Sequence, residues 1–164
     1  VLTDNPSTQK QNQRISRLVS VLPAGDAEHG RALFFSDRAT CSACHTVDGE
    51  GGIAGPDLSH IGMIRQRPDL LESILFPNAT IANSYETYTV VTTRGRTYQG
   101  IVRHAGTDWL VIMDQQRREI HLPRDELETL QRLPHSLMPQ GLEANFSQAE
   151  LGDLLAYLES LKPE

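Results

Sequence analysis

The spacing of apolar and polar positions predicts helices at both ends of the chain and strands between them. Residues 1–23 are polar with few apolar positions, so we expect a flexible tail or linker with one or two helical turns around 11–22. Asp26 predicts the N-cap of a helix that runs to about Ser36. Leucine and isoleucine at helical spacing predict a second helix over 68–75.

From Tyr85 the pattern changes to alternation of β-branched or aromatic residues with polar ones, which is typical of strands. We expect a β-meander of five short strands, at residues 87–93, 97–103, 109–114, 119–122 and 127–133, which forms a small antiparallel sheet or partial barrel. A final helix over 148–161 is expected, because Ser147 and Glu150 form a capping box before a leucine stripe. The sequence therefore predicts a mainly α fold, α+β overall, with one helical domain over 24–164 and a β-rich insertion at about 85–130.

Length and composition fit one domain, or one domain with a sizeable insertion. The chain has 164 residues, of which 38% are hydrophobic and 22% are charged, and its net charge of −6 argues against nucleic acid as a partner. No apolar run is long enough for a transmembrane segment. Because the sequence shows neither a secretory signal peptide nor an initiator Met, we expect a processed or excised piece of a longer polypeptide.

The strongest chemical signal is the pentapeptide Cys41-Ser42-Ala43-Cys44-His45, which contains the only two cysteines. C-x-x-C-H is the attachment signature of c-type haem: the thiols add to the two vinyl groups, and the histidine becomes an axial ligand of the iron. A glycine-rich loop at 48–56 follows and suggests a tight path of the chain against a large object. We therefore expect one covalently bound haem c, with His45 as an iron ligand.

The second axial ligand must come from another part of the chain, and Met138 is the best candidate. Pro139 follows it directly, and prolines stiffen a loop. A thioether prefers ferrous over ferric iron and so raises the reduction potential. Met113 falls in an expected strand and Met63 in a loop, while His135 would give bis-histidine ligation instead.

Three other uses of the two cysteines are less consistent with the sequence. They could form a disulfide, or half of a zinc site, but zinc would need further Cys or His ligands at similarly tight spacing, and the remaining histidines are scattered. A thioredoxin-like redox site would lie between a strand and a helix, whereas this motif follows a helix.

These motifs together resemble the pattern of class I cytochromes c. The matching positions are Gly30 and Phe34 in the first helix, the C-x-x-C-H motif, Gly55-Pro56-Asp57-Leu58, Met138-Pro139 and the final-helix run Leu154-Leu155-Ala156-Tyr157-Leu158. The chain is most similar to the C-terminal haem-binding domain of large, exported dehydrogenase-like multidomain proteins, over roughly residues 24–162. The resemblance implies a cytochrome c-like helical haem domain.

The resemblance also implies a role for individual positions. Pro56 is expected to offer its carbonyl to the ring N–H of His45, and Leu58 to pack on the haem. Gly30 is expected to let the first and last helices cross closely, near Leu155 and Tyr157. The resemblance and the C-x-x-C-H motif together imply that the haem is bound by Cys41, Cys44, His45, Pro56, Leu58 and Met138, with His45 and Met138 as the iron ligands.

The expected function is that of a one-electron carrier rather than an enzyme. With both axial positions filled by protein, the iron has no open position for a substrate. The resemblance implies a dehydrogenase module as electron donor and a cytochrome or oxidase as acceptor. Haem attachment to this motif normally occurs on the outer side of the cytoplasmic membrane, so we expect a periplasmic or otherwise exported protein.

Two other functions remain open from the sequence. A haem enzyme or gas sensor, for example a peroxidase-like protein, would need an open or labile distal position and a distal acid–base group such as His135. Alternatively, the β-segment is a binding module for a partner domain or glycan. Its aromatic residues are Tyr85, Tyr88, Tyr98 and Trp109.

Overall fold

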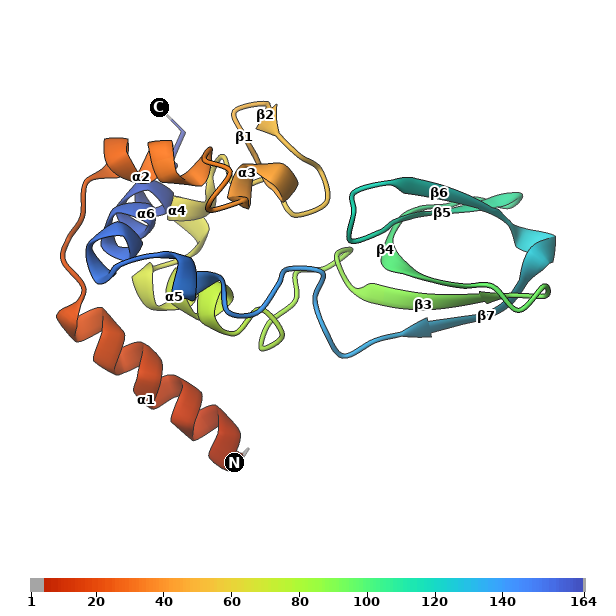
Figure 1. Cartoon of the computed structure of the whole chain (residues 1–164), viewed down its shortest axis with the longest axis horizontal. Helices are drawn as coiled ribbons and strands as arrows, with labels where there is room; N and C mark the ends of the chain where they lie inside the picture. Colours follow the sequence, from red (N-terminus) through yellow and green to blue (C-terminus); the bar gives the residue numbers. More distant parts are fainter. Residues whose placement is uncertain (1–4, 164) are drawn as a thin grey trace.

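The computed structural model describes residues 5–163, which form a helical part and a curled five-stranded sheet (Figure 1). The helices are α1 (Pro6–Val21), α2 (Ala27–Phe34), α3 (Cys41–Cys44), α4 (Ile61–Ile64), α5 (Arg67–Leu75) and α6 (Gln148–Ser160), with the 3-10 helices η1 (Arg124–Glu126) and η2 (Leu142–Asn145). The strands are β1 (Thr46–Val47), β2 (Glu50–Gly51), β3 (Thr87–Thr92), β4 (Thr97–Ala105), β5 (Trp109–Met113), β6 (Glu119–Pro123) and β7 (Leu127–Arg132). Within residues 5–163, none of the helices has the length and apolar character that a membrane crossing requires.

The prediction of a mainly α fold was wrong, because strands take too large a share of the chain. Helices hold 38% of the residues and strands 22%, so the class is mixed α and β. The sheet also has a separate apolar core, formed by the buried side chains of Val90, Leu110, Ile112 and Leu122. A sheet with its own core is a second structural layer beside the helices.

The strands of the large sheet follow the order β6-β5-β4-β3-β7, and all neighbours are antiparallel. The five expected strands are confirmed to within two residues at each end. The last strand departs from the expected meander, because β7 returns along β3 and pairs with it rather than with β6. In Figure 1 the sheet curls so that β5 and β6 lie across its interior from β3 and β7.

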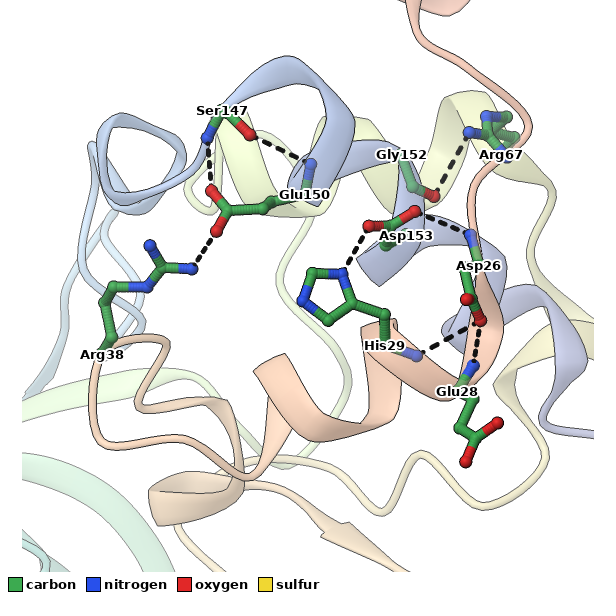
Figure 2. A network of polar contacts seen from close by, with 9 residues as sticks. All are labelled: Asp26, Glu28, His29, Arg38, Arg67, Ser147, Glu150, Gly152 and Asp153. Atoms are coloured by element: carbon green, nitrogen blue, oxygen red, sulfur yellow. Dashed lines mark hydrogen bonds and ion pairs between the residues drawn. The ribbon is translucent and has the colours of Figure 1, made fainter.

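Helices α2 and α6 cross at very short distance at Gly30. A Cβ atom added there would lie 2.0 Å from the carbonyl oxygen of Asp153 and 2.8 Å from the Cβ atom of Tyr157. The side chain of Asp153 accepts hydrogen bonds from the backbone N–H of Asp26 and from Nδ1 of His29, both at 2.7 Å (Figure 2). The absence of a side chain at Gly30 is therefore what allows this polar contact between the helices.

The helix caps predicted at Asp26 and Ser147 are confirmed. Asp26 accepts hydrogen bonds from the backbone N–H groups of the first turn of α2. Ser147 and Glu150 satisfy each other's backbone N–H groups in a capping box at the start of α6 (Figure 2). Glu150 also accepts a hydrogen bond from Arg38, and this bond, with the cap, lowers the pKa of Glu150 to about 2. Arg38 thereby ties the segment before α3 to the start of α6.

Helix α1 is much longer than the one or two turns expected around 11–22. Asn5 caps it by accepting a hydrogen bond from Ser7 N at 3.1 Å, and Ile15 is buried in the helical core. Arg14 donates to Glu143 Oε1 at 2.9 Å and so links α1 to η2. Tertiary contacts of this kind stabilise a helix whose composition is mostly polar. Residues 1–4 of the expected tail lie outside the described residues.

Candidate haem-binding site

The two cysteines lie at the ends of α3, a single helical turn. The preceding residue, Thr40, has a left-handed φ of 57°, which turns the chain sharply into this helix. Both thiols are free and partly buried. Burial raises the pKa of Cys41 to about 11. Burial also raises the pKa of Cys44, although the positive charge of Arg117 partly opposes this shift. At neutral pH both groups are therefore uncharged thiols held on one turn of helix.

His45 follows α3 directly, and its ring is oriented by one hydrogen bond. Nδ1 lies 2.8 Å from the carbonyl oxygen of Pro56. A carbonyl only accepts, so Nδ1 carries the proton and Nε2 keeps its lone pair. Burial lowers the pKa of His45, although the bond to Pro56 opposes this shift. A neutral imidazole with an available Nε2 is the form that binds a metal ion.

The glycine-rich loop passes directly against the C-x-x-C-H motif. A Cβ atom added at Gly52 would lie 2.1 Å from the carbonyl oxygen of Ala43, and one added at Gly55 would lie 2.6 Å from Cε1 of His45. Gly52 N also donates to Ser42 O at 2.8 Å, and Gly55 N donates to Cys44 O at 2.8 Å. The glycine-rich loop therefore packs closely against the backbone of the C-x-x-C-H motif and against the ring of His45.

Leu58 and Met138 border the same apolar core of the helical part. Both are partly buried and pack against it, as does Cys41. Met138 N donates to Ser136 Oγ at 3.1 Å, and Ser136 N donates to Asn78 Oδ1 at 2.8 Å. The loop that carries Met138 is therefore fixed by hydrogen bonds both within itself and to the segment after α5.

The other candidate ligands lie in different environments. Met63 is 66% exposed on α4, and His135 is exposed on the loop before Met138. Met113 is 4% exposed and belongs to strand β5, where it packs with Ile101 and Ala54. Of the three methionines, Met138 is the one that lies in a loop and is partly buried against the helical core.

Some contacts to the motif come from residues that the sequence analysis did not single out. Arg117, in the turn between β5 and β6, donates from Nη1 to the carbonyl oxygen of Ala43 at 3.4 Å. Leu137 packs in an apolar cluster with Cys44. No local pattern signals these contacts, because each joins segments that lie far apart in the sequence.

The structure gives the zinc alternative no additional ligands. Among residues 5–163 there is no group of three or more His, Cys, Asp or Glu side chains that could hold a metal ion. A tetrahedral zinc site would need four ligands in one place.

Comparison with known proteins agrees with this chemistry. The family model for cytochrome c matches residues 27–100, which run from the start of α2 through the C-x-x-C-H motif and into β4. No curated protein matches the chain. The family match supports a cytochrome c domain, and Met138 lies beyond the matched residues.

The cofactor of such a domain is haem c, a covalently bound haem with its iron, and both cysteines that it requires are present. The local geometry fits this group. Two uncharged thiols lie on one helical turn, and the imidazole of the next residue has a free Nε2. Cys41, Leu58 and Met138 pack against one apolar core.

Proposed function

We propose that this protein is a one-electron carrier in which haem c has His45 and Met138 as its axial ligands. The cytochrome c domain supports a haem-binding role in electron transfer. The single observation that carries the proposal is the 2.8 Å contact between His45 Nδ1 and the carbonyl oxygen of Pro56. This contact leaves Nε2 of a neutral imidazole available in the residue that directly follows Cys44, as a c-type iron ligand requires.

When bound, haem c supplies an iron ion that accepts and releases one electron. Cys41 and Cys44 would hold the group covalently through thioethers. Pro56 fixes the orientation of the His45 ring, and Leu58 would pack on the haem. Met138 offers a thioether, which favours ferrous iron and raises the reduction potential. With His45 and Met138 both bound to the iron, no position on the metal would remain free for a substrate.

The proposed role as an electron carrier also implies redox partners and a cellular location. A dehydrogenase module would donate the electron, and a separate cytochrome or oxidase would accept it. Attachment of haem to C-x-x-C-H outside the cytoplasmic membrane favours a periplasmic or otherwise exported protein. In this proposal residues 24–164 act as one electron-transfer domain, into which the strands at about 85–130 are inserted.

The test is the optical spectrum of the chain matured with a cytochrome c assembly system, ferric and ferrous, with and without carbon monoxide. We expect a low-spin spectrum with the long-wavelength sulfur-to-iron band and no response to carbon monoxide. A low-spin spectrum without that band would indicate bis-histidine ligation and would replace Met138 by His135. A high-spin spectrum, or prompt carbon monoxide binding, would contradict the carrier and favour a haem enzyme or gas sensor.

A further inference from the structure

One apolar cluster joins the sheet to both sides of the candidate haem site. Its buried members are Ile101 on β4, Met113 on β5 and Ala54 in the glycine-rich loop. Cys44, Tyr85 and Leu137 pack against these three side chains. We call these six residues the bridging cluster.

The bridging cluster combines residues that adjoin different proposed ligands. Cys44 directly precedes His45, and Ala54 directly precedes Gly55, whose position against the His45 ring allows no side chain. Leu137 directly precedes Met138. Ile101 and Met113 contribute side chains that are 1% and 4% exposed. The sheet therefore contacts the segments that carry both proposed axial ligands.

Hydrogen bonds connect the sheet to the same two segments independently of the apolar cluster. On the attachment side, Arg117 reaches the carbonyl oxygen of Ala43 at 3.4 Å. On the other side, Leu133 N donates to Thr87 O of β3 at 2.8 Å, at the point where β7 leads into the loop of Met138. In Figure 1 this loop runs from the end of β7 back towards the helices.

We infer that the sheet is a positioning element for the proposed iron ligands, with Ile101 and Met113 as positioning residues that hold the loop of Met138 in place through Leu137. This inference rests on the proposed function. A loop that is already ordered loses less conformational entropy when its methionine binds the iron. Buried side chains packed without voids transmit such constraints, whereas a cavity beside Leu137 lets the loop move.

The experiment compares two isoleucine-to-alanine substitutions in the holoprotein, Ile101→Ala and Ile112→Ala. Both residues are buried on neighbouring strands, at 1% and 0% exposure, but Ile101 lies in the bridging cluster and Ile112 in the sheet's own core. Each variant is titrated with imidazole in the ferric state and with carbon monoxide in the ferrous state. The sulfur-to-iron band and urea unfolding are recorded beside these titrations.

We expect Ile101→Ala to bind imidazole about tenfold more tightly than the wild type, a change of about 1.4 kcal/mol, with a weaker sulfur-to-iron band. Ile112→Ala should lose comparable stability to urea and keep its imidazole affinity within about twofold. Equal imidazole affinities in the two variants would overturn the inference. If either alanine variant does not accumulate, Ile101→Val and Ile112→Val make the same comparison with a smaller cavity.

The wild type separates failure of the inference from failure of the proposed function. A wild-type protein that already binds carbon monoxide promptly, with no sulfur-to-iron band, has no methionine ligand to position, so both proposals fall. A wild type with that band, alongside two variants that behave alike, refutes only the positioning role of the sheet.

Discussion

Nδ1 of His45 lies 2.8 Å from the carbonyl oxygen of Pro56, and Gly55, the residue before Pro56, lies so close to the His45 ring that it leaves no room for a side chain. The hydrogen bond fixes which nitrogen of the imidazole is protonated. The missing side chain leaves room for the ring. Tautomer and ring orientation thus depend on two consecutive residues of one loop.

Gly55→Ala is expected to disturb the site, because its Cβ atom would lie 2.6 Å from Cε1 of His45. The ring must shift and lose its alignment with Pro56, so we expect a lower yield of holoprotein and an altered ferric spectrum. Gly49→Ala is the control in the same loop. Its Cβ atom meets nothing within 4 Å, although its φ of +82° makes alanine strained by about 1 kcal/mol. A spectrum unchanged in Gly55→Ala would show that the ring is not constrained there.

Met138→Ala should leave haem covalently attached but remove a soft ligand that favours ferrous iron. We expect the reduction potential to fall by more than about 60 mV, which is tenfold in a one-electron equilibrium, and carbon monoxide to bind the ferrous form. Potentiometric titration and carbon monoxide difference spectra measure both effects. Met63→Ala removes a methionine that is 66% exposed and should change neither. An unchanged potential in Met138→Ala excludes this residue as the ligand.

Replacing Cys41 and Cys44 together by serine should abolish covalent attachment, since a serine hydroxyl does not form the thioether. The measurement is the haem that remains with the chain after denaturation and organic extraction. We expect essentially none in the double variant and nearly all in the wild type. Each single variant should keep one thioether and therefore retain haem through denaturation. Retention of haem by the denatured double variant would refute attachment at this motif.

The features that the sequence predicted well are encoded over a few neighbouring residues. The capping box at Ser147 and Glu150 is defined by two positions three apart, and the strands follow from local alternation. The attachment motif is equally local, because its two thiols and one imidazole occupy five consecutive positions. Predictions of this type do not depend on which distant segments come together.

The features that the sequence did not predict depend on distant contacts. The hydrogen bond of Arg14 to Glu143 links α1 to a partner 129 positions away, and β7 pairs with β3 after three intervening strands. The contact of Arg117 with Ala43 joins positions 74 apart. Apolar spacing within α1, at Ile15 and Leu18, was a signal that the polar composition of the segment obscured.

The contact between α2 and α6 predicts a pH dependence of stability. Asp153 accepts hydrogen bonds from His29 and from the backbone of Asp26, and these bonds hold its pKa below the ordinary value (Figure 2). Because folding lowers the pKa of Asp153, its carboxylate contributes fully to folding stability above the unfolded pKa of about 3.9. This contribution is lost as the pH falls through the lower pKa of the folded state. Stability should therefore decline from about pH 5 downward.

Asp153→Asn removes the titrating carboxylate and should lower the free energy of unfolding by about 1 kcal/mol at neutral pH. The value is modest because the side chain of His29 is 52% exposed. Urea unfolding of the holoproteins from about pH 7 to about pH 3 should show the wild type and variant converging as pH falls. Asp125→Asn is the charge-matched control, since this exposed carboxylate has no hydrogen bond or ion pair within residues 5–163. Its curve should run parallel to that of the wild type. A constant difference between wild type and Asp153→Asn across this range would mean that Asp153 is not the titrating group.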